Sequence, residues 1–304
     1  MHFNDREKII ALTPLWKGER LPDGRPKVED KYLDALYEMT LEEVWKPIFV
    51  LGYENQFVGG GEAPLHALHN DGRKLVGRAV TCSYCPIRPD LHELQFAKGA
   101  EDGRSGNYNQ WVIDNLMERD VVVCDMYDKI YKGTFLGGNL TTAIKKRTKN
   151  GGAVIWGGIR DVEQMKAVPD VQVYYRGIDP TPIREFVMKD YNDITYFGGA
   201  VCLPGDVVFG AGGGVLFIPA HLVATVVEGA AKTHVKDDFG FEMIGQGKFT
   251  TAQIDRNTWT IEMLDMLTEW IQTDQRGERY RDLDWSREYE MAINGDPNDT
   301  QTAL

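Results

Sequence analysis

Short apolar runs separated by glycine characterise the middle of the chain, from Leu75 onward. Segments with helical spacing of apolar positions lie between these runs, notably residues 108–118 and 140–149. Alternation of strands and helices at this spacing predicts an α/β layered domain. The expected strands cover residues 75–82, 120–124, 153–156, 171–175, 207–209 and 215–218.

The N-terminal part of the chain has a different pattern. Residues 1–28 are polar and interrupted by proline and glycine, which predicts an irregular arm. Helical spacing follows over residues 32–39. Thr40 and Glu43 then form a capping-box pattern, which predicts a second short helix that ends before Pro47.

Amphipathic helices are expected after the last strand, over residues 221–233 and 250–272. Many glycines between residues 52 and 73 indicate a long loop before the first strand. Residues 273–304 are charged and rich in turn formers, and they form either a tail or an arm around a neighbouring subunit. The simplest division is an N-terminal arm at 1–30, a core domain at 31–235 and a helical extension with a tail at 236–304.

The composition argues against several classes of partner. Among the 304 residues, 42% are hydrophobic and 11% aromatic, which suits a globular protein with a packed core. The net charge of −12 argues against nucleic-acid and anionic-membrane partners. No apolar run approaches the roughly 20 residues of a membrane span, and the segment from Met1 to Arg6 lacks the apolar core of a signal peptide. We therefore expect a soluble, cytoplasmic protein with no nucleic-acid or membrane partner.

The four cysteines are expected to be thiols in such a compartment. Cys82 and Cys85 form a Cys-x-x-Cys pair, to which His92 could add a third metal ligand. No second pair completes a tetrahedral set, so two thiols near a strand end are the favoured interpretation.

A strand–helix–strand crossover carries the candidate chemistry. The β-branched run Val121-Val122-Val123 suits a strand buried on both faces. A glycine pair, Gly137-Gly138, then precedes the helical segment at 140–149, and the next buried strand is followed by Arg160-Asp161. If the two strands are parallel, the start of the helix and the Arg160-Asp161 pair lie on the same edge of the sheet.

The residue types on that edge suit a small carboxylate and a divalent metal ion. Free amides at the helix start, around Asn139 and Thr141, attract anions. The planar fork of Arg160 matches a carboxylate. Asp161 supplies a hard oxygen ligand that suits Mg²⁺. An adjacent Arg-Asp pair is also common as a plain surface ion pair, which is the alternative for these two residues.

A glycine-rich segment, Gly210-Ala211-Gly212-Gly213-Gly214, invites comparison with nucleotide-binding loops. It fits neither the dinucleotide-binding pattern nor a phosphate-binding loop with its lysine. Because it precedes an expected strand, a tight turn between strands is favoured. The histidines show no catalytic or ligand spacing.

Taken together, these segments resemble the RraA-like family, which includes the regulator of ribonuclease E activity and the class II 4-hydroxy-4-methyl-2-oxoglutarate aldolases. The resemblance covers roughly residues 73–230. It rests on Gly138-Asn139-Leu140, on Arg160-Asp161 after a spacing of twenty residues, on Val76-Gly77-Arg78-Ala79-Val80-Thr81, and on Pro204-Gly205-Asp206 with Gly214-Val215 and Pro219.

The resemblance implies a three-layer β/β/α domain, here with an N-terminal arm and a helical C-terminal extension, assembled as a homotrimer or homohexamer. It implies that Asp161 binds Mg²⁺ or Mn²⁺ and that Arg160 binds the oxygens of a small 2-oxo acid. Together with Gly138 and Asn139, the amides of Leu140 and Thr141 would form the substrate-binding edge, and Arg160 and Asp161 would be the catalytic pair.

The leading hypothesis is therefore a metal-dependent carbon–carbon lyase, an aldolase or decarboxylase that acts through a pyruvate enolate. The chain departs from the family pattern at two positions. Asn139 and Ala211 stand where members of the family usually carry an acidic residue. The alternatives are a non-catalytic, protein-binding regulator, and a sugar-acid lyase or dehydratase that uses the same site.

Overall fold

The computed structural model describes residues 3–61 and 63–295. The chain divides into two compact units, Met1–Val226 and Val227–Leu304. This division falls inside one helix, α8 (Val223–Gly245), whereas the sequence suggested a boundary after residue 235. The N-terminal arm groups with the first unit.

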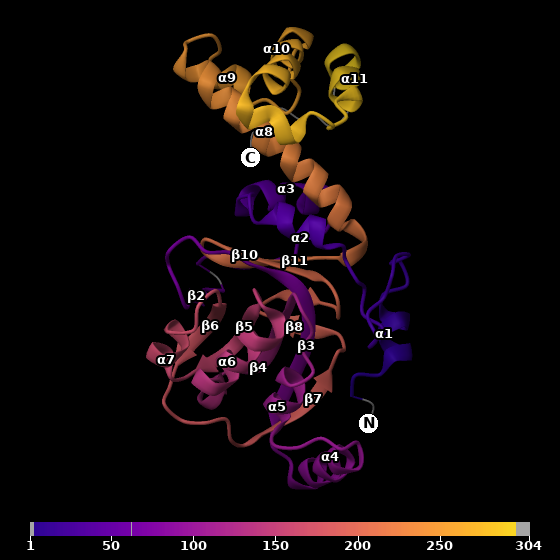
Figure 1. Ribbon diagram of the computed structural model, residues 1–304, viewed down its shortest axis with the longest axis vertical. Coiled ribbons are helices and arrows are strands. Elements are labelled where there is room, and N and C mark those ends of the chain that lie inside the picture. The colour runs from indigo at the N-terminus through magenta and orange to yellow at the C-terminus, as the bar shows by residue number, and fades with distance from the viewer. Residues whose placement is uncertain (1–2, 62, 296–304) are drawn as a thin grey trace. The chain divides into compact units, whose positions relative to one another are not determined.

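A mixed sheet forms the centre of the first unit (Figure 1), in the order β1-β11-β10-β3-β4-β5-β6-β2, with β7 paired to β3. The four strands β3 to β6 are parallel, and the remaining pairs are antiparallel. The strands are β1 (Phe57–Gly59), β2 (His66–Ala67), β3 (Leu75–Pro86), β4 (Asp120–Leu136), β5 (Gly152–Ile159), β6 (Gln172–Ile178), β7 (Phe186–Tyr191), β10 (Val207–Ala211) and β11 (Gly214–Ile218).

All six expected strands are present, and β3 and β4 extend further than predicted. Successive residues of β4 face opposite sides of the sheet, as strand geometry requires. Val122 and Cys124 belong to one apolar cluster, and Val121 and Val123 belong to another. The β-branched run is therefore buried on both faces, as its composition predicted.

Helices cover one face of the sheet and a small hairpin covers the other. The first cluster includes side chains of α5 (Tyr108–Ile113), α6 (Gly138–Thr148) and α7 (Val162–Lys166). The second cluster includes Phe197 and Cys202, from the hairpin of β8 (Thr195–Phe197) and β9 (Ala200–Cys202). This arrangement confirms the α/β fold class with its β/β/α layers.

The capping box is confirmed, but the length of its helix is not. Thr40 accepts a hydrogen bond from the amide of Glu43, whose carboxylate accepts one from the Thr40 amide. The helix α3 (Leu41–Val50) continues through Pro47 because Val44 and Ile48 are buried on one face. It contacts β10 and β11, and α2 (Asp30–Leu36) contacts β3 (Figure 1).

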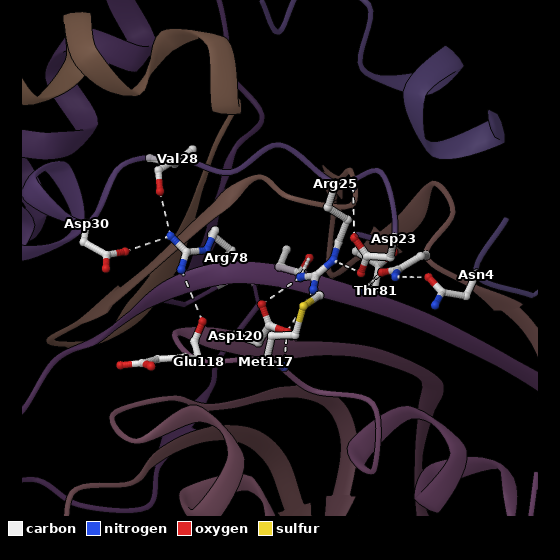
Figure 2. A network of polar contacts seen from close by, with 12 residues as sticks. Asn4, Asp23, Arg25, Val28, Asp30, Arg78, Thr81, Met117, Glu118 and Asp120 are labelled. Carbon is white, nitrogen blue, oxygen red and sulfur yellow. Dashed lines mark hydrogen bonds and ion pairs between the residues drawn. The ribbon is translucent and has the colours of Figure 1, made fainter. Parts of the chain in front are cut away.

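The N-terminal arm is more ordered than its composition suggested. It contains the helix α1 (Arg6–Leu12), whose first turn is capped by Asp5. Figure 2 shows how the following segment is anchored to the sheet. Arg25 lies fully buried and forms a two-pronged ion pair with Asp120, which is also fully buried.

A second arginine, Arg78 of β3, extends this network (Figure 2). Its guanidinium donates to the carbonyl of Val28 at 2.6 Å and to Asp30 at 3.0 Å. The same group donates to the carbonyl of Glu118 at 3.2 Å. Two buried arginines therefore attach the arm to the start of the sheet.

The expected C-terminal helices differ in length from those observed. One helix, α8, follows the turn η1 (Ala220–Leu222) and extends well beyond residue 233. The region expected as one helix over 250–272 is divided into α9 (Thr251–Ile254) and α10 (Ile261–Thr273), because Thr260 caps a new helix start. The helix expected over 108–118 is also short, since α5 ends at Ile113.

The second unit has its own aromatic contacts. Phe239 lies 5.8 Å from Trp259 and 6.1 Å from Trp270, measured between ring centroids. The segment expected to be turn-rich contains η2 (Gln275–Tyr280) and α11 (Ser286–Asn294), and its last residues, 296–304, lie outside the described part. Among the described residues, no helix combines the length and apolar character needed to cross a bilayer.

The sequence did not predict the helix α4 (Pro89–Glu101). It buries few side chains, among them Gln95, so its apolar pattern is weak. It precedes α5 along the chain and lies beside it in Figure 1.

Candidate functional site

The expected crossover is present and its strands are parallel. Val121 of β4 pairs with Gly152 of β5, and α6 connects the two strands. At the other end, the Arg160 amide donates to the Leu136 carbonyl at 2.9 Å. The end of β4, the start of α6 and the Arg160-Asp161 pair therefore meet at one edge of the sheet.

Asp161 is held in an uncommon backbone conformation. Its φ and ψ angles of 56° and 37° lie in the left-handed region, directly before α7. Its Oδ2 atom accepts a hydrogen bond from the Gly138 amide at 3.2 Å and lies 3.5 Å from Nε of Arg160. The side chain is 38% exposed, so the carboxylate also faces solvent.

Gly137 allows this close approach between α6 and Asp161. A Cβ atom at Gly137 would lie 2.5 Å from Oδ2 of Asp161 and 3.1 Å from Nε of Arg160. The φ angle of Gly137 is −148°, so the requirement for glycine here comes from space and not from the backbone conformation. Sequence reasoning noted the glycine pair but did not place Gly137 in the site.

The first backbone amides of α6 differ in what they donate to. The Thr141 amide donates to the Gly137 carbonyl at 3.0 Å, so it is engaged within the helix. The Gly138 amide donates to Asp161. Among the described residues of this helix start, the amides of Asn139 and Leu140 lie in the first turn, where no intrahelical carbonyl accepts them, and the side chain of Asn139 is exposed.

The segment between β6 and β7 forms a further wall that sequence reasoning missed. The Asp179 amide donates to the carbonyl of Ile159 at 3.1 Å, directly before Arg160. Hydrogen bonds from the hydroxyl and amide of Thr181 lower the pKa of Asp179. The hydroxyl of the buried Thr134 donates to the carbonyl of Thr181. The carbonyl of Thr134 lies 3.5 Å from Nη1 of Arg160. The sequence gives only a weak signal for this wall, because Thr181 stands out only by lying between Pro180 and Pro182.

Basic side chains lie along the same wall. The Arg184 amide donates to the carbonyl of Lys132 at 2.9 Å. Lys132 forms an ion pair with Glu185, and this hydrogen bond lowers the pKa of Glu185. Gln164 of α7 completes the edge, because a Cβ atom at Gly138 would lie 2.7 Å from its Oε1 atom.

The donor set at this edge suits a water-rich divalent metal site. Among the residues that the structure describes, no three or more His, Cys, Asp or Glu side chains are grouped to hold a metal ion. Asp161 offers one carboxylate beside the helix start, where its Oδ2 atom accepts the Gly138 amide. Mg²⁺ commonly takes only one or two protein carboxylates and keeps several water ligands, so a single exposed carboxylate fits it.

The other candidate motifs are structural elements. Cys82 and Cys85 lie on β3 as free thiols, with Cys82 buried, as the strand interpretation predicted. Ala211 pairs with Gly214 across the turn between β10 and β11, so this glycine-rich segment is the predicted tight turn between strands.

Comparisons with known proteins show the family and the fold of the chain. The model of the RraA-like family (Aldolase/RraA) matches residues 53–217. A protein of Pseudomonas aeruginosa (strain LESB58), named "Putative 4-hydroxy-4-methyl-2-oxoglutarate aldolase", is 28% identical over 156 residues, which are 47% of this chain and 96% of that protein. Protein DlpA of Legionella pneumophila is 28% identical over 159 residues, but the match spans only 23% of its length and 52% of this chain.

Solved structures share the fold. Streptomyces coelicolor RraAS2, described as an unusual member of the RNase ES inhibitor RraA protein family, has a TM-score of 0.55 at 21% identity. The match covers 71% of this chain and 97% of that one. An uncharacterized protein from Pseudomonas syringae pv. tomato str. DC3000 has a TM-score of 0.61 at 20% identity, covering 78% of this chain and 98% of that one. With the family model matching more than half of its length, this chain belongs to the RraA-like family.

Proposed function

We propose that this protein is a divalent-metal-dependent carbon–carbon lyase, an aldolase or decarboxylase, that acts on a small 2-oxo acid through a pyruvate enolate. The observation that carries the proposal is the meeting of Asp161, Arg160 and the free amides of α6 at one sheet edge. The relative named as an aldolase, which aligns over almost its whole length, supports the same class of reaction.

The chain's own groups would bind and orient the substrate. The amides of Asn139 and Leu140 would donate to the carboxylate of the 2-oxo acid, with the helix start favouring its negative charge. The guanidinium of Arg160 would donate to the 2-oxo oxygen, where negative charge develops as the enolate forms. A positioned donor of this kind contributes roughly 3 kcal/mol to transition-state stabilisation.

Asp161 would hold Mg²⁺ or Mn²⁺ beside these donors. When bound, such an ion supplies Lewis-acid polarisation of the substrate oxygens. The amide of Gly138 and the guanidinium of Arg160 contact Oδ2 of Asp161 and would keep the carboxylate oriented. This support is the reason for placing the metal at Asp161 and not at a carboxylate elsewhere on the surface.

Pyruvate release tests the proposal directly. The protein would be incubated with Mg²⁺ or Mn²⁺ and a panel of 4-hydroxy-2-oxo acids and oxaloacetate, with and without EDTA. We expect pyruvate from at least one compound, lost on chelation and restored by added metal. Absence of metal-dependent pyruvate from every compound would exclude the pyruvate-lyase function.

A non-catalytic regulator is the second candidate, and one observation favours it. The exposed residue at the helix start is the neutral Asn139, where the aldolases carry an acid. A regulator would give no turnover with any compound, and Arg160→Ala would leave its binding to a protein partner unchanged. An Asn139→Asp variant separates the candidates further, since added turnover in that variant points to a lyase scaffold.

A further inference from the structure

A small cavity lies at the edge of the sheet where the parallel strands end, the same edge that carries Arg160. It has a volume of about 120 Å³ and is bordered by the residue after β3, by α4, by the start of α5 and by residues 183–186. A cavity of roughly 150 Å³ lined by apolar side chains is large enough to bind benzene. The cavity therefore has the size of one substituent of a small molecule.

One strand, β4, separates the cavity from Arg160. The side chain of Asn109, which lines the cavity, donates to the carbonyl of Phe135 in β4 at 3.0 Å. The neighbours of Phe135 in the chain both contact Arg160. The Thr134 carbonyl lies 3.5 Å from its Nη1 atom, and the Leu136 carbonyl accepts its amide. Since neighbouring strands lie about 4.8 Å apart, the far substituent of a 2-oxo acid held at Arg160 can reach the cavity.

Aromatic rings and branched aliphatic side chains form much of the wall. The ring centroids of His92 and Phe96 in α4 lie 4.5 Å apart, and Tyr108 of α5 lies 4.9 Å from Phe96, edge to face. Ile87 and Ile183 also line the cavity. Ile87 is 40% exposed, so part of this apolar wall is open to solvent. Edge-to-face and offset contacts stabilise aromatic pairs beyond the burial of their area, so this wall favours a planar ring.

Several polar groups of the lining already have partners. Both polar atoms of the Asn109 side chain are engaged by the backbone. Nδ1 of His92 lies 3.0 Å from the Tyr108 hydroxyl. The carboxylate of Glu185 forms its ion pair with Lys132. A polar substituent would compete with these partners, whereas an apolar ring leaves the hydrogen bonds intact.

The exposed Arg184 also lines the cavity. Its planar guanidinium can stack on an aromatic face as well as pair with a carboxylate. A carboxylate that enters an apolar cavity loses its hydration, which costs far more than the transfer of a ring. The carboxylate of Glu185 lines the same cavity and adds negative charge there. An aromatic group is therefore favoured over a second carboxylate.

We propose that this cavity receives an aromatic substituent of the substrate, which makes the substrate a 4-aryl-4-hydroxy-2-oxo acid. This assignment rests on the proposed function of the neighbouring edge. Cleavage would break the bond between C3 and C4 and leave its electron pair on C3, as the pyruvate enolate. The 4-hydroxyl group loses its proton as C4 becomes the carbonyl carbon of an aromatic aldehyde. A proton added at C3 of the enolate then gives pyruvate.

Three 4-hydroxy-2-oxo acids that differ only in the substituent at C4 test the proposal. The compounds carry phenyl, methyl or carboxylate there, and pyruvate release by the full chain with Mg²⁺ gives kcat/KM for each. We expect kcat/KM to be roughly tenfold or more higher for the phenyl compound than for either of the others. A kcat/KM for the methyl or carboxylate compound equal to or above that for the phenyl compound would overturn the assignment.

A substitution that fills the cavity locates the aromatic group. Ile183→Trp should lower kcat/KM for the phenyl compound roughly tenfold or more and change that for the methyl compound little. Ile194→Trp is the matched control, because Ile194 is 51% exposed and does not line the cavity. An unchanged preference for phenyl in Ile183→Trp would show that the ring binds elsewhere.

A binding measurement separates failure of this proposal from failure of the proposed lyase function. Benzyl alcohol, an unreactive analogue of the aromatic aldehyde, would be titrated into the wild type and Ile183→Trp and followed by saturation-transfer NMR. We expect saturable binding that Ile183→Trp weakens. Such binding without pyruvate from any compound would reject the lyase and retain the aromatic pocket. Pyruvate from the methyl compound, with neither phenyl turnover nor benzyl alcohol binding, would retain the lyase and overturn the pocket.

Discussion

The guanidinium of Arg25 and the carboxylate of Asp120 face each other in two parallel hydrogen bonds, Nη1–Oδ1 at 2.8 Å and Nη2–Oδ2 at 2.9 Å. Arg25 also donates to the carbonyl of Ala79 at 3.2 Å and to Asp23. Burial alone would lower the pKa of Arg25, but the charge and hydrogen bonds of Asp120 and Asp23 raise it. The arm is therefore attached to the sheet by a fully satisfied buried charge.

Breaking this pair should strongly destabilise the protein. Asp120→Ala leaves Arg25 charged and buried without its main partner, and the loss of one member of a buried pair costs about 3–5 kcal/mol. Urea denaturation monitored by circular dichroism measures the change. Lys27→Ala is the control in the same arm, because Lys27 and Glu19 form an exposed pair and its loss should change stability little. Equal effects of the two substitutions would contradict the role of the buried pair.

Gly137→Ala should weaken metal binding. The added methyl group would lie 2.5 Å from Oδ2 of Asp161 and would displace the carboxylate. Changes to groups that orient a metal ligand typically cost 10–100-fold in affinity, and we expect a loss in that range for Mn²⁺, followed by electron paramagnetic resonance. Gly213→Ala is the control, since nothing lies within 4 Å of a Cβ atom there. An unchanged Mn²⁺ affinity in Gly137→Ala would place the metal elsewhere.

Arg160→Lys should lose as much activity as Arg160→Ala. A lysine keeps the charge but lacks the planar fork that reaches two oxygens at once. We expect both variants to lose roughly 100-fold or more in kcat for pyruvate release. Arg147→Lys, on the exposed side of α6, should be fully active. A fully active Arg160→Lys would mean that charge alone is required at this position.

The stability of the protein should fall with rising pH because of Asp206. Burial raises the pKa of Asp206 to about 7, although the amides of Leu203 and Ala220 oppose the shift. An acid with a raised pKa contributes stability below its unfolded value near pH 3.8, and this contribution is lost as the pH rises through 7. Asp206→Asn cannot ionise, so its melting temperature should fall less than that of the wild type between pH 5 and 8. Parallel curves for the two proteins would show that Asp206 does not titrate in this range.

The central crossover could be predicted from local patterns alone. The run Val121-Val122-Val123 is β-branched, and the following segment has helical spacing of its apolar positions, so the type and order of these elements are evident from the sequence. The hairpin of β8 and β9 was not predicted, because its strands have three residues each and depend on Phe197 packing against the sheet. Short strands of this kind are defined by tertiary contacts and leave little periodic signal.

Some residues of the candidate site could be predicted from the sequence and others could not. Arg160 and Asp161 could be located because they follow a buried strand directly. Gly137 and Thr181 could not, because their roles depend on strand pairing that brings residues 134–137, 160–161 and 179–181 together. Arg25 was missed for a related reason, since an arginine in a polar arm looks solvated until its distant partner Asp120 is known.

The attachment of the arm should suppress local unfolding at this end of the first unit. Arg25 and Asp120 are 95 residues apart in the chain, so their contact closes a long loop that includes β3 and α5. Detaching the arm alone would remove the guanidinium of Arg25 from the buried Asp120, and breaking a buried ion pair in this way costs about 3–5 kcal/mol. Partial opening at the arm is therefore disfavoured, and its backbone amides near Arg25 should exchange hydrogen for deuterium as slowly as those in the centre of the sheet.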